Sequence, residues 1–211
     1  MGGQAKWGPR TTALQARAGG ARRLYTWAMP NLDHPTIPAL KDKFNGQGLS
    51  ATEFRGQTTV VVPPARVHEV LAFLKNEGYD FLSDVVGVDY LNYPKPRTGG
   101  PTGRFAVVYN LLNTSTDRRI FIKTLMDPTL ETRGTEPDPA LEVPTATDLW
   151  PGAEWLEREV FDMFGIRFTD HPDHRRILMW EAYPTHPLRK DYPVRGSGER
   201  ESLRVVERDS A

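Results

Sequence analysis

Hydrophobic and polar residues follow a regular pattern only between about residues 48 and 168. The run GQTTVVV, Gly56 to Val62, is rich in β-branched residues and predicts a strand. Pro63 and Pro64 then suit the start of a helix, and Gly78 supplies its stop. Between them, apolar residues at i, i+3, i+4 and i+7 predict an amphipathic helix with one buried face: Val67, Val70, Leu71 and Leu74.

Three more strands and a second helix follow in the same domain. YDFLSDVVGVDY over 79–90 is strand-like, and RFAVVYNLL and RRIFIKTLM are joined by the short turn at 113–117, which indicates a hairpin. After a proline-rich loop at 127–147, apolar residues return with helical spacing over 153–164. This order predicts an α+β fold, with a three- to four-stranded mixed sheet and helices packed on one face.

The two ends of the chain lack this periodicity. Residues 1–45 are rich in glycine and basic side chains, and we expect a basic, flexible N-terminal extension there. A transit peptide is the weaker alternative because the segment is poor in serine. Residues 46–168 form the predicted α+β domain. Residues 169–211 are interrupted by prolines, and we expect an extended C-terminal arm that must lie on another surface to stay ordered.

Composition excludes several classes of function. Lysine plus arginine equals aspartate plus glutamate at 27 each, so no net charge attracts the chain to nucleic acid or to anionic lipid. The chain contains no cysteine, which excludes disulfides, thiol nucleophiles and cysteine-ligated iron–sulfur clusters. No apolar run approaches the roughly 20 residues of a spanning helix, so any contact with a membrane is expected to be indirect.

The helix predicted over 153–164 carries an unusual load of charge. At about 100° per residue, Glu157 projects into or beside the apolar arc of this helix, while Arg158, Glu159 and Asp162 lie on the other side. A buried, unpaired carboxylate is costly, so we expect a basic residue of the arm to pair with Glu157 or Glu159. The candidates are Arg175, Arg176, Arg189 and Lys190. The alternative is a solvated helix face held by pairs such as Glu154 with Arg158.

Histidines after this helix raise the possibility of a metal site. His171, His174 and His186 are accompanied by Asp170 and Asp173, and both residue types bind zinc or iron. A proline interrupts the interval between the first two histidines, and no HExxH arrangement is present. The acids at 157 and 159 also point to different sides of the helix, which is poor geometry for acid–base catalysis. We therefore expect no catalytic, cofactor-binding or metal-binding residue in this chain.

The stretch EREVFDMFGIRFTDHPDHRRIL, followed by HPLRKDYP, resembles the signature of the 30-kilodalton subunit family of respiratory complex I. Complex I is the proton-pumping NADH:quinone oxidoreductase. The resemblance also includes FLSDVVGVDYLNYP and VPTATDLWPGAEWLERE, and it covers roughly residues 79–195. His174 departs from the pattern, because relatives usually carry leucine there, and this departure further weakens the metal interpretation.

The resemblance implies a structural subunit of the peripheral arm without a cofactor of its own. It implies packing on the large, 49-kilodalton quinone-site subunit, near iron–sulfur subunits. Those partners would hold FMN and the iron–sulfur clusters. The expected location is the cytoplasmic face of a bacterial cell membrane, with the matrix side of the mitochondrial inner membrane as the alternative. An equivalent scaffold in a membrane-bound hydrogenase or another donor:quinone complex is the second interpretation, and a free-standing histidine–metal enzyme is the third.

The resemblance assigns an interface and structural role to charged residues of the helix and the arm. These are Glu157, Arg158, Glu159, Asp162, His171, Arg175, Arg176, His186, Arg189, Lys190 and Asp191. Trp180, Tyr183 and Tyr192 would be aromatic anchors on the partner, and the arm would gain its order only there. On this interpretation, replacing Arg175 or Arg189 by alanine weakens assembly more than folding.

Overall fold

A five-stranded mixed sheet forms the centre of the protein. The computed structural model describes residues 34–44, 48–93, 102–131 and 134–199. Within them the sheet has the order β1-β2-β5-β4-β3; β2 pairs with β5 in parallel, and the other neighbours are antiparallel. The strands are β1 (Ser50–Phe54), β2 (Gln57–Val61), β3 (Phe81–Asp89), β4 (Phe105–Asn113) and β5 (Arg118–Met126).

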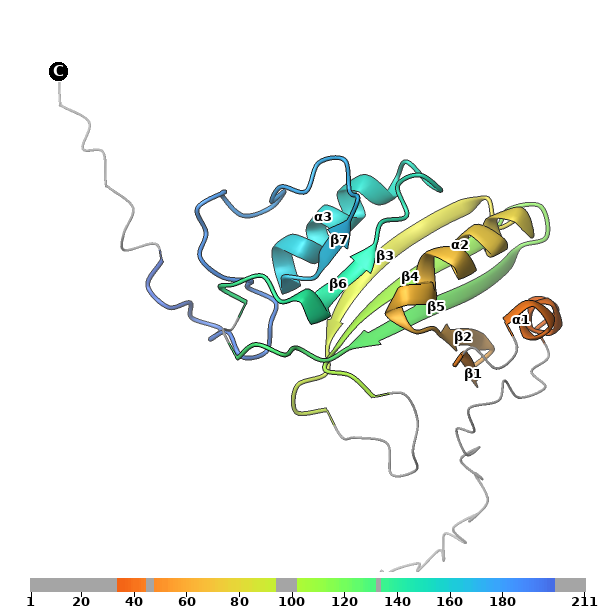
Figure 1. Ribbon diagram of the computed structural model, residues 1–211, viewed down its shortest axis with the longest axis horizontal. Coiled ribbons are helices and arrows are strands. Elements are labelled where there is room, and N and C mark those ends of the chain that lie inside the picture. Colours follow the sequence, from red (N-terminus) through yellow and green to blue (C-terminus); the bar gives the residue numbers. More distant parts are fainter. Residues whose placement is uncertain (1–33, 45–47, 94–101, 132–133, 200–211) are drawn as a thin grey trace, which may run out of the picture.

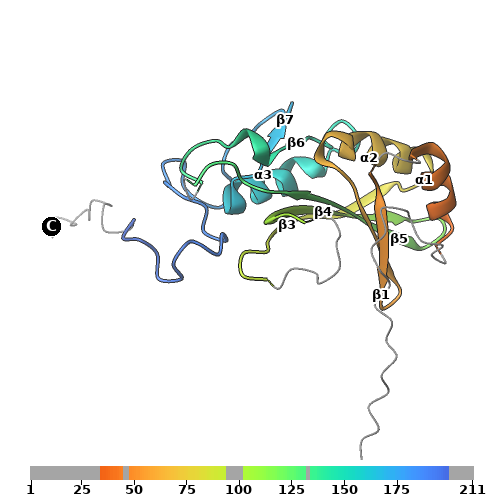
Figure 2. The same ribbon diagram turned by 60° about the horizontal axis from the view of Figure 1, so that its bottom comes forward.

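The α-helices of the described residues lie on one face of this sheet, as Figure 2 shows. The short strands β6 and β7 pair in parallel beside them and form a separate two-stranded sheet. The α+β fold class predicted from the sequence is therefore confirmed. The remaining elements are α1 (Thr36–Phe44), α2 (Val67–Asn76), α3 (Ala153–Phe164), β6 (Glu142–Pro144), β7 (Arg167–Thr169) and the 3₁₀ turns Pro64–Arg66 and Pro139–Leu141.

The sheet is larger than the predicted three or four strands because SATEF, 50–54, pairs with β2 as β1. Arg55 and Gly56 connect the two strands, and both have positive φ, 53° and 76°. Two successive residues in the left-handed region are typical of a tight hairpin turn. The segment before Gly56 carries little hydrophobic alternation, so the sequence pattern alone did not reveal this strand.

Helix α1 corrects the boundary of the predicted N-terminal extension. Residues 34–44 belong to the folded domain, because Ile37, Leu40 and Phe44 are buried in the main core. The hydroxyl of Thr36 also forms a buried hydrogen bond of 2.8 Å with the Tyr79 hydroxyl. Residues 1–33 and 45, the rest of the predicted extension, lie outside the described residues.

The close contact between α3 and β3 depends on a glycine. A Cβ atom at Gly87 of β3 would lie 2.4 Å from Cδ2 of Phe164, closer than two non-bonded carbon atoms can approach. The missing side chain lets the end of α3 pack directly on the sheet. Helix α3 is thereby held beside the end of β3, where the arm also lies.

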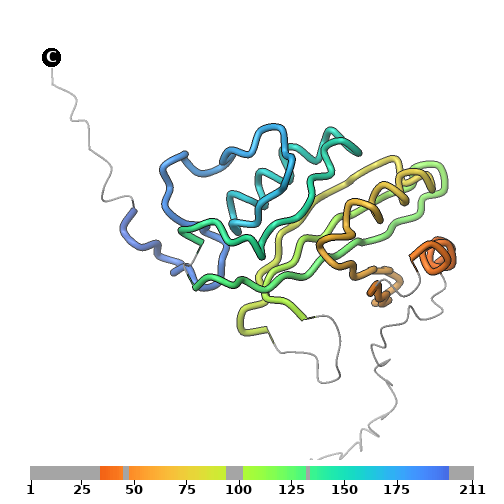
Figure 3. The backbone as a smooth tube through the Cα atoms, in the orientation of Figure 1, coloured from red at the N-terminus to blue at the C-terminus, as the bar shows by residue number. Residues whose placement is uncertain are grey.

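The arm folds back onto its own domain, contrary to the expectation that only a partner orders it. Residues 170–199 contain no helix or strand in the structure, and they run beside α3 and past the end of β3 (Figures 1 and 3). Tyr183, His186 and Arg189 of the arm are buried within this single chain. Residues 200–211 lie outside the described residues.

Leu40→Ala tests whether α1 is part of the cooperative fold. Leu40 is fully buried, and deleting a buried leucine side chain costs about 2–5 kcal/mol in the free energy of unfolding. Urea unfolding followed by circular dichroism measures this change. Asp42→Ala, an exposed position of the same helix, is the control and should remain within about 0.5 kcal/mol of wild type. Equal stability of both variants would show that α1 does not belong to the core.

Candidate functional site

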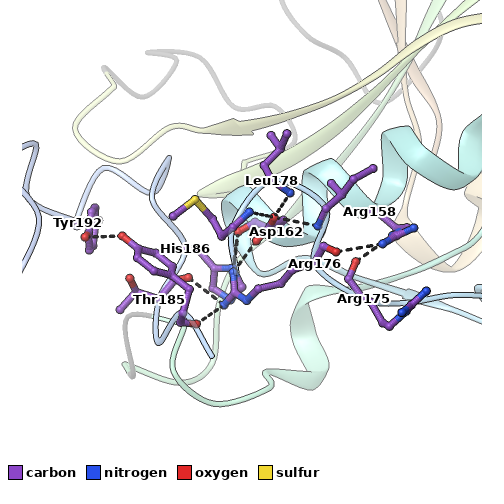
Figure 4. A network of polar contacts seen from close by, with 11 residues as sticks. Arg158, Asp162, Arg175, Arg176, Leu178, Thr185, His186 and Tyr192 are labelled. Carbon is purple, nitrogen blue, oxygen red and sulfur yellow. Dashed lines mark hydrogen bonds and ion pairs between the residues drawn. The ribbon is translucent and has the colours of Figure 1, made fainter. Parts of the chain in front are cut away.

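The carboxylate of Asp162 is the centre of the polar network that joins α3 to the arm (Figure 4). Its side chain is fully buried and accepts hydrogen bonds from four donors. Oδ1 accepts from Nη1 of Arg176 at 2.6 Å. Oδ2 accepts from three successive backbone N–H groups at 3.1, 2.7 and 2.8 Å, those of Ile177, Leu178 and Met179.

These donors keep Asp162 ionised in spite of its burial. Burial alone raises the pKa of a carboxyl group, because it disfavours the charged form. The N–H of Met179, the Arg176 guanidinium and the other two N–H groups outweigh this effect, and the pKa of Asp162 lies below its ordinary value. Asp162 is therefore a fixed negative charge around which the chain at 176–179 is wrapped.

Arg176 connects this charge to the next part of the arm. Its Nη2 donates to the carbonyl oxygens of Tyr183 at 2.8 Å and Thr185 at 2.9 Å. The guanidinium also lies 5.8 Å from the centre of the Tyr183 ring, which is cation–π range. One arginine thus holds three points of the chain together, 162, 183 and 185.

The arm also caps the C-terminal end of α3. The last carbonyl groups of a helix have no partner within the helix. Here His186 Nδ1 donates to the carbonyl of Asp162 at 2.9 Å, and the N–H of Leu188 donates to that of Met163 at 3.1 Å. Arg189 Nη1 donates to the carbonyl of Phe164 at 3.3 Å. Residues of the motif HPLRKDYP, His186, Leu188 and Arg189, therefore cap helix α3.

Gly165 makes this cap possible. Its φ of 79° ends α3 in the left-handed conformation that glycine adopts without strain. A Cβ atom there would lie 2.7 Å from Cδ2 of His186, so the imidazole occupies the space that a side chain would need. Burial lowers the pKa of His186, and the ring is therefore neutral near pH 7 and donates through Nδ1.

A second buried ion cluster fixes the arm to the end of β3. Asp89 accepts from Arg104 at 3.0 and 3.2 Å and from the N–H of Lys190 at 2.9 Å. Arg104 also pairs with Asp191 at 2.9 Å, and Arg189 pairs with Asp191 at 3.4 Å. Both guanidinium groups lie within 5 Å of the centre of the Phe105 ring, at 4.6 and 4.8 Å.

Asp89 and Arg104 were not singled out in the sequence. Both lie at the ends of strands that were predicted from hydrophobic residues alone, and this pattern says nothing about the charged residues beside them. Burial raises the pKa of Asp89, but the hydrogen bonds from Arg104 and from the N–H groups of Lys190 and Leu91 outweigh it and hold the pKa low. One feature of the sequence could have revealed this pair. Asp89 ends one apolar strand and Arg104 precedes the next, and these two ends lie side by side when consecutive strands pair in an antiparallel way.

Glu157 is buried, but the prediction that a basic residue of the arm pairs with it is wrong. Its side chain is fully buried, and none of the lysine or arginine side chains in the described ranges pairs with it. Thr145 Oγ1 donates to Oε2 at 2.5 Å, and the N–H of Ala146 donates to Oε1 at 2.7 Å. His171 Nε2 lies 3.9 Å from Oε2. Burial therefore dominates and raises the pKa of Glu157 to about 7.

The basic residues pair with aspartates instead. Arg176 pairs with Asp162, and Arg175 pairs with Asp173 on the surface at 2.6 Å. Arg158 donates to the carbonyl oxygens of residues 175 and 176, both at 3.0 Å, and lies 3.3 Å from Asp173. The alternative of a solvated face with a Glu154–Arg158 pair is therefore also wrong. Glu159 is exposed and forms no ion pair within the described residues.

The ring nitrogens of His171 and His174 form hydrogen bonds with backbone groups. His171 accepts from the N–H of Asp173 at 3.1 Å and contacts the carbonyl of Glu154 at 3.0 Å. His174 accepts from the N–H of Phe168 at 3.0 Å, and burial lowers its pKa to about 4. In the described part of the chain, no three histidine or carboxylate groups gather as a metal site would require.

Comparison with known proteins identifies the family. The family model of the 30 kDa subunit of respiratory-chain NADH dehydrogenase matches residues 60–198. The chain belongs to this family. The match includes the strands β3, β4 and β5, the helix α3, the two ion clusters and the arm as far as residue 198. Members of the family are subunits of NADH-quinone oxidoreductase, a multi-subunit respiratory enzyme.

Individual members of the 30 kDa family agree with this assignment. The corresponding NADH-quinone oxidoreductase subunit of Geobacter metallireducens is 39% identical over 160 residues, which cover 75% of this chain and 88% of that protein. NADH-quinone oxidoreductase subunit 5 of Thermus thermophilus is 46% identical over 144 residues, covering 66% and 63% of the two chains. The solved trypsin-resistant fragment (1–134) of Nqo5 is 36% identical and covers 65% of this chain and 98% of the fragment, with a TM-score of 0.52.

No helix in the described ranges combines the length and apolar character that crossing a membrane requires.

Asp162→Asn tests the central role of this carboxylate. The amide removes the negative charge and turns a donor toward either Arg176 or the three backbone N–H groups, so we expect a loss of about 3–5 kcal/mol in the free energy of unfolding. Limited trypsin digestion should also cut faster after Arg175 and Lys190 of the loosened arm. Glu159→Gln, on the exposed side of α3, is the matched control and should stay within about 0.5 kcal/mol of wild type. If trypsin cut the arm equally slowly in both variants, Asp162 would not be the residue that holds the arm in place.

Glu157→Gln tests the buried acid through pH. Glu157 has a folded-state pKa of about 7 against an ordinary 4.5, so the folded protein keeps a proton that the unfolded chain releases. Its stabilising contribution is complete below pH 4.5 and is lost as pH rises through 7. The stability of wild type relative to Glu157→Gln should therefore fall by roughly 3 kcal/mol between pH 4.5 and 7.5.

Urea unfolding of both proteins across this pH range measures that difference. His174 and His186 have lowered pKa values and give the opposite slope, but they are present in both proteins and cancel in the comparison. A difference that does not change with pH would contradict the raised pKa of Glu157.

Proposed function

We propose that this chain is a structural subunit, without a cofactor or catalytic site of its own, in the peripheral arm of a proton-translocating NADH:quinone oxidoreductase. It positions the large quinone-site subunit for electron transfer from NADH through iron–sulfur clusters to quinone. The observation that carries the proposal is the arrangement of the arm. Arg176, His186 and Arg189 are bonded inward to the end of α3, whereas Leu178, Trp180 and Leu188 are exposed.

The inward part of this arrangement makes the arm rigid. Asp162, Arg176 and the cap on α3 join the arm to the domain by hydrogen bonds in buried surroundings. Such bonds are strong, and breaking one leaves a buried group unsatisfied. The arm is therefore a shaped surface before any partner binds, which reduces the entropic cost of association.

The outward part of the arm supplies the surface. Leu178 is 62% exposed, Leu188 55% and Trp180 38%. Exposed apolar and aromatic residues grouped on one segment are typical of protein–protein interfaces. Trp180 packs edge-on against Tyr183 at 4.6 Å, so this aromatic group is already positioned.

We assign the cofactors to the partner subunits, FMN and iron–sulfur clusters among them. Such clusters are held by cysteine thiolates, and this chain contains no cysteine. We propose the large quinone-site subunit as the main partner, with iron–sulfur subunits nearby. The proposed location is the cytoplasmic face of a bacterial membrane, with the mitochondrial matrix side as the alternative, and membrane contact through partner subunits.

Purification of the tagged chain in mild detergent tests the proposal. Recovery of NADH-oxidising, cluster-bearing subunits supports it. Recovery of a nickel-containing subunit would instead indicate the equivalent position in a membrane-bound hydrogenase. A chain that is isolated alone, with a stoichiometric metal whose removal abolishes an activity, would overturn the proposal.

Leu178→Asp provides a sharper test of the arm surface. Its side chain is exposed, so the free energy of unfolding should change by less than about 0.5 kcal/mol, while a charge in a desolvated interface should reduce complex recovery about tenfold or more. Phe54→Asp is the matched control, because Phe54 is 69% exposed and lies at the end of β1, away from the arm. Equal recovery of both variants would remove Leu178 from the interface.

A further inference from the structure

A groove of about 700 Å³ lies between the end of the arm and the segment that follows β3. One wall is formed by Leu91, Asn92 and Tyr93, and the other by residues 187–190 and 192–194. Most of the lining is apolar, aromatic or proline. It has three strongly exposed apolar residues on its rim: Tyr93 at 64%, Leu188 at 55% and Val194 at 105%.

Both walls of the groove are held in place by contacts already made within the chain. Asp89 accepts from the N–H of Leu91 at 2.8 Å and from the N–H of Lys190 at 2.9 Å, so one buried carboxylate fixes the spacing between the walls. Tyr93 is oriented by a backbone hydrogen bond to Tyr90 and by an edge-on ring contact of 5.6 Å. On the other wall, Tyr192 shares a 2.6 Å hydroxyl contact with Tyr183.

The charges around the groove do not balance. Lys190 lines the groove, and Arg195 follows its last lining residue in the chain. Both are exposed, and neither side chain forms an ion pair within the described residues. The nearby acids are already engaged: Asp191 pairs with Arg104 and Arg189, and Glu199 accepts from the N–H of Ser197 at 2.8 Å. The groove thus combines a largely apolar lining with an exposed lysine that has no acidic partner in the described part of the chain.

We propose that this groove binds an extended segment of a partner protein that carries an acidic side chain beside an apolar or aromatic one. The apolar side chain lies between Tyr93 and Leu188, and the carboxylate meets Lys190. Ligand pockets for small molecules bury most of their ligand, whereas the rim residues here are highly exposed, which favours a chain passing through the groove. This inference rests on the proposed function, because it names the chemistry of one docking segment.

Photo-cross-linking within the assembled complex tests the occupant. Tyr93 is replaced by p-benzoylphenylalanine in the full chain, and Phe54, an equally exposed aromatic residue on the β1–β2 hairpin, is replaced in a control protein. After irradiation and digestion, mass spectrometry should identify one partner peptide at position 93 with an acid next to an apolar residue. The control should not yield that peptide.

Charge reversal tests the ionic part of the proposal. Lys190→Glu should lower recovery of the partner about tenfold at low salt, and the deficit should shrink as salt screens the charges. Arg118→Glu is the matched control, an exposed cation at the start of β5 with no ion pair within the described ranges, and recovery should not change.

The outcomes separate this inference from the proposed function. A wild-type chain that recovers no partner overturns both. An intact complex in which position 93 cross-links to this chain, to a second copy, to lipid or to nothing overturns the groove assignment alone. An intact complex in which Lys190→Glu assembles as well as wild type likewise overturns it.

Discussion

The arrangement of the arm depends on the need to satisfy one buried carboxylate. Asp162 lies in the last turn of α3, where the helix dipole does not favour an acid. Its charge must therefore be stabilised by groups from elsewhere in the chain. Arg176 and three successive backbone N–H groups provide this, and they can do so only if the chain at 176–179 bends around the carboxylate.

The other contacts of the arm follow from that bend. Once Arg176 is in place, its second nitrogen reaches the carbonyl groups at 183 and 185, and the chain that follows lies over the end of α3. There His186, Leu188 and Arg189 cap the open carbonyl groups. A buried ion pair adds little net stability over well-packed apolar groups, but leaving one of its charges unpaired is costly, so this network disfavours other paths of the arm. Leu178, Trp180 and Leu188 of the arm remain exposed.

Strong local patterns made much of the fold predictable. Helix α3 occupies 153–164 as its apolar spacing predicts, and the β4–β5 hairpin follows from two apolar runs and a short turn. Strand β1 and helix α1 were missed because each is short and weakly patterned, and both are stabilised by long-range contacts with β2 and the core. The burial of Glu157 followed from helical phase, but its partners did not, because Thr145 and Ala146 reach it from a loop whose path no periodicity describes.

The sequence by itself determined the family, the α+β class, the main strands and helices, and the inventory of charges on α3 and the arm. These depend on local spacing and on a long ordered motif, which can be read along the chain. Only the tertiary structure decided which charges meet. Helical periodicity places Asp162 on the polar side of α3, yet its side chain is buried, because the arm covers it there. A residue's angle on its helix is a local property, whereas the segment that packs against it is set by contacts between distant parts of the chain.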